Sequence, residues 1–283
     1  MTPDEQLTYF DTNGYLNRGP VLTAAEVEAM RDGLDRVISL ERGDGDDSSV
    51  EFKYGHDREG DAPEESGRDA RAIHQYVNMW KRDPAYEAAI HNPKIAATAC
   101  RLLRTPRVRL WHDQVISKPP GDNAHFGFHQ DFYFWPLGPP NIVSCWLALD
   151  DATVDTGCMH VIPESHADPR FSPEAWARET SAAQTARDEG RPAEKTERDR
   201  MREADPSHGI PVELAAGDCM FHHCLNFHGT PPNVTDRQRR AFVMIFMAEG
   251  VRYNHAQSPG HILVPTIEVA DGEPLVGDAF PVA

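Results

Sequence analysis

A change of hydrophobic period near residue 107 constrains the fold of this chain more than any other feature. From there apolar and polar side chains alternate with period two, as in Val108-Arg109-Leu110-Trp111, and such alternation is typical of β-strands. Seven further strands are predicted near residues 127–134, 142–149, 158–162, 211–214, 218–223, 226–229 and 239–249. Short strands separated so often by Gly and Pro favour a mostly β fold, with a double-stranded β-helix or jelly-roll, cupin-like barrel core.

The first third of the chain has a different pattern. Thr23-Ala24-Ala25-Glu26 is a capping box, and apolar residues then recur at helical spacing to about Leu40. A second helical region is predicted over residues 83–104. We therefore expect one domain over 1–283, in which flanking helices of residues 1–105 pack outside a barrel core of residues 106–250, followed by a C-terminal extension of residues 251–283.

Residues 168–208 interrupt the barrel with a charged segment that has few apolar residues. One interpretation is a solvated helical insertion. The other is a lid over the mouth of the barrel, because long insertions in compact domains are often lids.

Composition narrows the range of partners. The net charge of −17 repels phosphate backbones and anionic lipids, so no nucleic-acid or membrane partner is expected. No apolar run approaches the length of a membrane span. Five cysteines without CxxC spacing indicate reduced thiols. These features predict a cytoplasmic protein with a small-molecule substrate; they leave its oligomeric state open.

One pair of polar residues stands out within the predicted strands. His129 and Asp131 are two positions apart, so on a continuous strand they would share a face with Tyr133. His228 follows from a distant strand. Two imidazoles and one carboxylate form the facial triad that binds non-heme Fe(II) and leaves three coordination positions open.

An arginine begins the last apolar strand. Arg239 shares a face with Ala241 and Val243, so it should point inward, whereas Arg240 should face outward and pair with an acidic side chain. Burying a guanidinium without a partner is costly. Its planar fork suits a carboxylate bound through two hydrogen bonds, and a small dicarboxylic acid would supply one.

With these motifs in place, most of the chain resembles the phytanoyl-CoA dioxygenase family of Fe(II)/2-oxoglutarate oxygenases. The similar segments are Phe10–Leu16, His129-Gln130-Asp131, Trp146, Asp150–His166, Gly217–His223 and His228-Gly229-Thr230 with Asn233, Thr235 and Arg239. Glu164 stands where the family usually has Gly.

The resemblance implies an oxygenase that uses Fe(II), 2-oxoglutarate and O2. It would hydroxylate or otherwise oxidise an unactivated C–H bond and release succinate and CO2. The implied iron ligands are His129, Asp131 and His228. Related halogenases lack the carboxylate, so Asp131 favours hydroxylation. Arg239 and Thr230 would hold the distal carboxylate of 2-oxoglutarate, and the family also places Trp146, Gln114 and Lys118 at its pocket.

Further residues are candidates for the substrate pocket. Tyr133, Trp135, Trp111 and His125 are candidates for the substrate pocket, as is His112, although each also fits an ordinary core, strand or loop position. His222 and His223 are interpreted as strand or core histidines. The main alternative function is a catalytically idle metal-binding barrel with a binding or regulatory role. A cupin-like metalloenzyme without 2-oxoglutarate would leave Arg239 and Thr230 unexplained.

Overall fold

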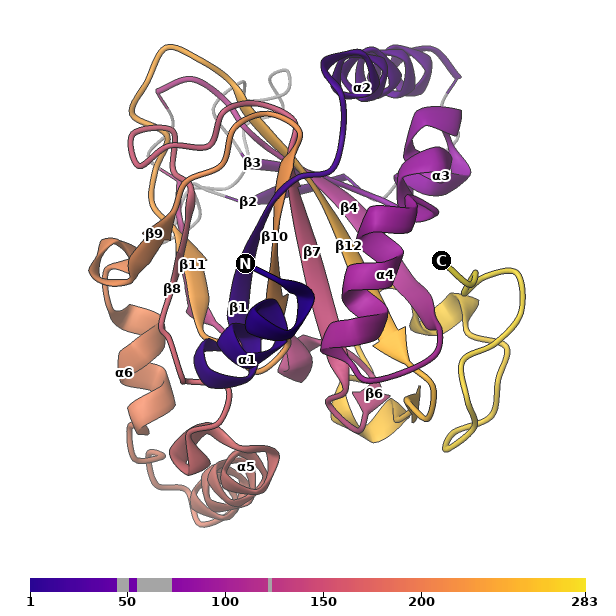
Figure 1. Cartoon of the computed structure of the whole chain (residues 1–283). Coiled ribbons are helices and arrows are strands. Elements are labelled where there is room, and N and C mark those ends of the chain that lie inside the picture. The colour runs from indigo at the N-terminus through magenta and orange to yellow at the C-terminus, as the bar shows by residue number, and fades with distance from the viewer. Residues whose placement is uncertain (45–50, 55–72, 122–123) are drawn as a thin grey trace.

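A seven-stranded antiparallel sheet forms the centre of the computed structural model, which describes residues 1–44, 51–54, 73–121 and 124–283 (Figure 1). Its strand order is β1-β10-β7-β12-β4-β3-β2. The strands are β1 (Tyr15–Pro20), β10 (Asp218–His223), β7 (Ile142–Ala148), β12 (Arg239–Ala248), β4 (Val108–Lys118), β3 (Ile73–Val77) and β2 (Glu51–Tyr54). Strands β7, β12 and β4 are buried along almost their whole length.

A smaller antiparallel sheet lies against it, in the order β5-β11-β8-β9. Its strands are β5 (Phe126–His129), β11 (His228–Thr230), β8 (Met159–Val161) and β9 (Ile210–Val212), and a two-stranded sheet pairs β6 (Leu137–Gly138) with β13 (Arg252–Tyr253). Apolar residues of both larger sheets, among them Val243, Ile245 and Val161, share one buried cluster. Two packed antiparallel sheets are the predicted jelly-roll core.

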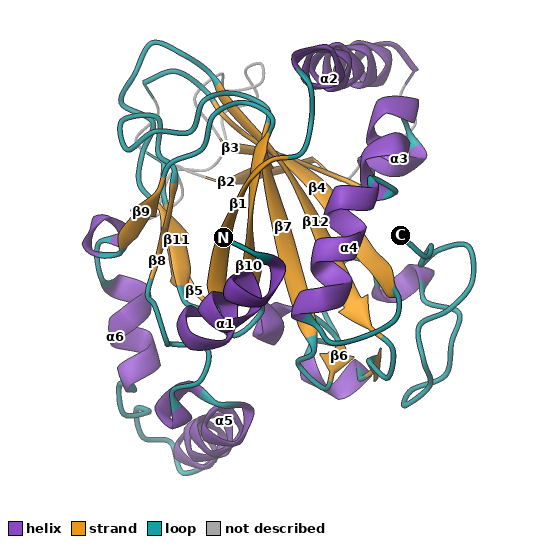
Figure 2. Ribbon diagram, in the orientation of Figure 1, coloured by secondary structure: helices purple, strands orange, loops and turns teal. Residues whose placement is uncertain are grey.

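Four helices cover the outer face of the large sheet (Figure 2). They are α1 (Pro3–Asn13), α2 (Ala24–Asp44), α3 (Pro84–Ile90) and α4 (Pro93–Leu102). The ring of Tyr86 packs on Phe242 with centroids 4.9 Å apart, and its hydroxyl donates to the carbonyl of Met30. Residues 1–105 also supply β1, β2 and β3. An extended segment was expected at Tyr15-Leu16, where β1 begins, but the prediction of a helical first third missed β2 and β3.

The segment 168–208 is helical and packs beside the small sheet (Figure 1). It contains η3 (Pro169–Phe171), α5 (Pro173–Asp188), α6 (Glu197–Glu203) and η4 (Pro206–His208). Phe171 packs against Phe128 and Phe227 in a small separate cluster. One charged residue of α6, Arg198, is buried at 3% exposure and anchors the segment, although most of its other residues are exposed.

The C-terminal residues fold back onto the large sheet. The amide of Leu110 donates to the carbonyl of Pro281, and the amide of Ala283 donates to the carbonyl of Val108. Short turns η1 (Met79–Lys81), η5 (His255–Gln257) and η6 (Val264–Thr266) complete the described elements. All five cysteines are free thiols, as predicted. Within the described ranges, no helix is both long and apolar enough to cross a membrane.

Candidate metal centre and co-substrate pocket

Three metal-ligating side chains converge at the small sheet. His129 ends β5 and His228 begins β11, and the two residues are directly paired across these antiparallel strands. The Oδ1 atom of Asp131 lies 3.4 Å from Nε2 of His129 and 3.5 Å from Nε2 of His228. One potential ligand atom of each residue lies within 4.8 Å of the others, a spacing that suits a single ion bound on one face.

The backbone reaches this arrangement by a different route from the one predicted. A strand over residues 127–134 was wrong: β5 ends at His129, and Asp131–Phe134 is the 3-10 turn η2. The amide of Phe132 donates to the carbonyl of Cys224, and the amide of Trp135 donates to the carbonyl of Phe132. The carboxylate therefore reaches the imidazoles through a turn, and the strand alternation expected to align Tyr133 with them does not occur.

Backbone carbonyls orient both imidazoles. Nδ1 of His129 lies 2.9 Å from the carbonyl of Gly127, and Nδ1 of His228 lies 3.0 Å from the carbonyl of Asn226. Because a carbonyl only accepts, each Nδ1 carries the proton and each Nε2 presents a lone pair to the shared space. Such second hydrogen bonds are typical of histidines that bind metals.

Two further side chains contact the second carboxylate oxygen of Asp131. Its Oδ2 accepts from the hydroxyl of Ser144 at 3.1 Å and lies 3.2 Å from Nε2 of His222. Burial alone would raise the pKa of Asp131, but His228, His129 and His222 lower it well below its usual value. His222 lies outside the ligand cluster, in agreement with its interpretation as a core histidine, yet its contact with Asp131 was missed, as was Ser144.

A buried cation lies at the start of β12 in the large sheet. Arg239 is fully buried, and its Nε, Nη1 and Nη2 atoms have no hydrogen-bond partner in the part of the chain that the structure describes. Its guanidinium lies 5.2 Å from the ring centroid of Trp146. Burial lowers the pKa of Arg239 to about 10, so the side chain remains charged at neutral pH. An unpaired buried guanidinium is unfavourable, and a carboxylate ligand would remove that cost.

The neighbours of Arg239 are the residues that the resemblance implied. Lys118 pairs with Arg239 across β4 and β12, and its ammonium donates to the carbonyls of Thr230 and Pro231. The Thr230 hydroxyl is buried without a partner among the described residues. Lys118 therefore holds the end of β11 beside Arg239, while Thr230 and Arg239 keep unused donors for a ligand.

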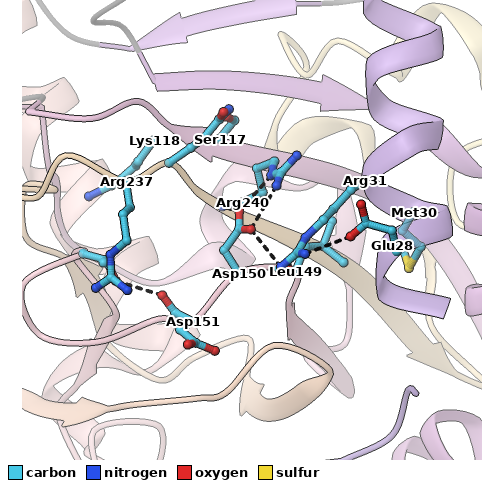
Figure 3. A network of polar contacts seen from close by, with 12 residues as sticks. Glu28, Met30, Arg31, Ser117, Lys118, Leu149, Asp150, Asp151, Arg237 and Arg240 are labelled. Atoms are coloured by element: carbon cyan, nitrogen blue, oxygen red, sulfur yellow. Dashed lines mark hydrogen bonds and ion pairs between the residues drawn. The ribbon is translucent and has the colours of Figure 1, made fainter. Parts of the chain in front are cut away.

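The next residue, Arg240, points to the opposite face. It donates two side-chain hydrogen bonds to Asp150, which also pairs with Arg31 (Figure 3). The predicted pairing with an acidic side chain is therefore present, although the pair is mostly buried.

A cavity of about 490 Å³ opens on the metal centre, and His129 and Asp131 form part of its wall. Trp135 and Gln114 line it, whereas Arg239, Thr230, Trp146 and Lys118 do not belong to its described lining. Among the residues that the structure describes, the cavity wall does not include Tyr133, Trp111 or His125. Tyr133 donates to the carbonyl of Phe171 and stacks on Trp176, with ring centroids 5.1 Å apart.

The other two candidates also lie elsewhere. Trp111 is buried and stacks on Phe280 with ring centroids 5.6 Å apart, and His125 is exposed. The C-terminal extension instead contributes Ser258, His261 and Ile262 to the cavity. No periodic pattern marks this contribution, so the sequence did not reveal it.

A comparison with known proteins settles the family. A family model described as phytanoyl-CoA dioxygenase (PhyH) matches residues 10–241. The chain belongs to the phytanoyl-CoA dioxygenase family. The predicted family is thereby confirmed.

Relatives within the phytanoyl-CoA dioxygenase family are distant. Phytanoyl-CoA dioxygenase 1 of Oryza sativa subsp. japonica is 30% identical over 182 residues, which are 58% of this chain and 64% of the rice protein. The peroxisomal phytanoyl-CoA dioxygenase of Rattus norvegicus is 22% identical over 275 residues, or 94% of this chain and 75% of the rat protein. The chain thus spans slightly less than two thirds of the rice protein.

Solved structures agree in fold. The non-heme alpha-ketoglutarate-dependent carbocyclase SnoK from nogalamycin biosynthesis has a TM-score of 0.73 at 23% identity, covering 100% of this chain and 98% of SnoK. The epimerase SnoN, in complex with Fe3+, alpha-ketoglutarate and nogalamycin RO, has a TM-score of 0.71 at 21% identity, covering 99% of this chain and 98% of SnoN. At this identity the similarity shows the shared fold.

Proposed function

We propose that this chain is an Fe(II)- and 2-oxoglutarate-dependent dioxygenase that hydroxylates, or otherwise oxidises, an unactivated C–H bond of a small organic molecule and releases succinate and CO2. The observation that supports it best is that the chain has, besides the triad of His129, Asp131 and His228, a fully buried Arg239 whose guanidinium has no hydrogen-bond partner among the described residues. An idle barrel would gain nothing by keeping this costly charge.

The side chains at the site suit both iron and 2-oxoglutarate. Two imidazole Nε2 atoms and Oδ1 of Asp131 would hold iron, because their other polar atoms are already engaged. Arg239 and Thr230 would hold the distal carboxylate of 2-oxoglutarate, with the Trp146 ring 5.2 Å from the guanidinium and Lys118 paired with Arg239. Gln114 would contact the co-substrate from the wall of the cavity. Bound iron, with 2-oxoglutarate and O2, would supply the oxidising chemistry.

The chain itself would orient the metal ligands and keep water away from the reacting carbon. The backbone carbonyls fix the imidazole tautomers, and Ser144 and His222 keep Oδ1 of Asp131 turned toward the ion. The cavity walls of Trp135, Val243 and Ile245 exclude water from the substrate carbon that faces the centre. The presence of Asp131 favours hydroxylation over halogenation.

A succinate assay tests the proposal. Purified protein with Fe(II), 2-oxoglutarate and O2 should form succinate, and Asp131→Ala or His228→Ala should abolish it. His208→Ala, a change at an exposed histidine, serves as the control. Undiminished succinate in either ligand variant would reject the assigned triad. Arg239→Ala should raise the 2-oxoglutarate concentration needed for half-maximal rate by about tenfold or more.

A further inference from the structure

Two histidines of the cavity are used neither by the metal centre nor by the co-substrate pocket. His112 lies on β4, and His261 lies in the C-terminal extension between η5 and η6. Both line the cavity that contains His129 and Asp131, and their ring centroids are 5.8 Å apart. His261 falls outside the region matched by the family model, which ends at residue 241.

The hydrogen bonds at the two Nδ1 atoms give these rings opposite polarity. Nδ1 of His112 lies 3.4 Å from the carbonyl of Asp113, so Nδ1 carries the proton and Nε2 is an acceptor. Nδ1 of His261 accepts the amide of Leu263 at 3.2 Å, so its Nε2 carries the proton and is a donor. Nε2 of His112 is buried and has no partner among the described residues.

Both rings are neutral at physiological pH. Burial, with a smaller effect of His261, lowers the pKa of His112 to about 3. Burial lowers the pKa of His261 to about 4. The described lining of the cavity contains no Lys or Arg, and its remaining walls include the apolar side chains of Phe126, Trp135 and Ile262.

We propose that His112 and His261 are the substrate-recognition pair of this enzyme and that they bind a neutral hydroxyl group on a partly apolar substrate. A hydroxyl both donates and accepts, so it would donate to Nε2 of His112 and accept from Nε2 of His261. Sites built to hydrogen-bond a hydroxyl discriminate strongly against analogues that lack it, because the buried polar groups are then left unpaired. The inference rests on the proposed function, because it assigns the substrate class of the same cavity.

Binding of small probes tests the pair without turnover. The probes are 2-phenylethanol, its methyl ether and phenylacetate, added at millimolar concentration to protein loaded anaerobically with Fe(II) and 2-oxoglutarate, and affinity is measured by ligand-observed NMR. The alcohol should bind about threefold to tenfold more tightly than the ether, because the ether cannot donate to His112. Phenylacetate should bind more weakly than the alcohol, because an ionised carboxylate cannot donate to His112 and the described lining holds no Lys or Arg to pair with it.

Variants separate the two histidines. His112→Phe should remove the preference for the alcohol over the ether, and His112→Gln, which retains an acceptor, should restore it. His261→Phe should weaken both probes equally, because both have an acceptor oxygen. His208→Phe should leave all affinities unchanged, and melting curves identify any variant that fails to fold.

The outcomes are distinct. Equal binding of alcohol and ether to the wild type, binding of neither probe, or a preference that survives in His112→Phe overturns the inference. If His112→Phe does not fold, the equal loss in His261→Phe remains decisive. A protein that forms no succinate but discriminates between the probes rejects the proposed function and keeps the recognition pair.

Discussion

Nε2 of His222 lies 3.2 Å from Oδ2 of Asp131, the carboxylate oxygen on the far side from the other two imidazoles. Ser144 donates to the same oxygen. The two contacts come from neighbouring strands of the large sheet, β10 and β7, so the large sheet fixes the orientation of a ligand carried by the turn η2. Ser144 and His222 therefore add rigidity to the metal centre, although neither is one of its three ligands.

Loss of the His222 contact should weaken metal binding. His222→Phe removes the hydrogen bond to Oδ2 and keeps an aromatic ring, so the Co(II) dissociation constant should rise about 10- to 100-fold. Isothermal titration calorimetry measures this change, with His208→Phe as the control. Unchanged Co(II) affinity in a folded His222→Phe protein would show that Asp131 is oriented by other contacts.

Removal of the buried guanidinium should stabilise the protein while it prevents co-substrate binding. Without 2-oxoglutarate, Arg239→Met should raise the free energy of unfolding by roughly 1 to 4 kcal/mol, because an unpaired buried charge is replaced by an apolar side chain. The wild type should gain stability on addition of 2-oxoglutarate, and the variant should not. Urea unfolding with and without 2-oxoglutarate provides the comparison. A destabilised Arg239→Met protein would mean that the guanidinium has a structural partner.

The helical segment 168–208 should depend on one arginine. Arg198 donates to Glu179 at 3.0 Å and to Gln130, and its guanidinium lies 4.5 Å from the ring centroid of Tyr133. In Arg198→Ala, amide hydrogen exchange should accelerate across α5 and α6 because their anchor to the core is lost. Arg191→Ala, which changes an exposed arginine, is the matched control. Equal exchange in both variants would contradict an anchoring role.

Buried neutral histidines should make the fold sensitive to acid. Burial, followed by the neighbours His166 and His222, lowers the pKa of His223 to about 3, from 6.5. The unfolded chain binds this proton first, so its contribution to stability is complete above about pH 6.5 and is lost as the pH falls toward 3. His223→Asn keeps an acceptor for the amide of Leu225, so its free energy of unfolding should fall less steeply over this range. Parallel pH profiles for the two proteins would count against the effect.

The sequence predicted the elements that follow simple periodicity. The strands around β4, β7 and β12 were found because their alternation is regular, and the inward direction of Arg239 followed from its register with Ala241 and Val243. The small strands β2 and β3 were missed because four or five residues carry too little periodic signal. Their place in the sheet depends on pairing with β4, which is a tertiary contact.

The site was predictable to the extent that local motifs encode it. His129, Asp131, His228 and Arg239 were found from spacing and resemblance. The turn that carries Asp131 was not, because it depends on a hydrogen bond from Phe132 to distant Cys224. His112 was named as a substrate candidate and does line the cavity. Ser144 and His261 were missed because no local motif marks them, and only the folded arrangement shows their contacts.

The turn η2 is held by parts of the chain that lie beyond the shared barrel. Gln257 donates to the carbonyls of Phe132 and Trp135, and Ser258 donates to the carbonyl of Phe134. These contacts join the C-terminal extension to the loop that carries a metal ligand. The segment that lines the cavity with Ser258, His261 and Ile262 therefore also supports the turn that carries Asp131. A chimera that exchanges residues 250–283 would change the cavity wall and the support of a metal ligand together.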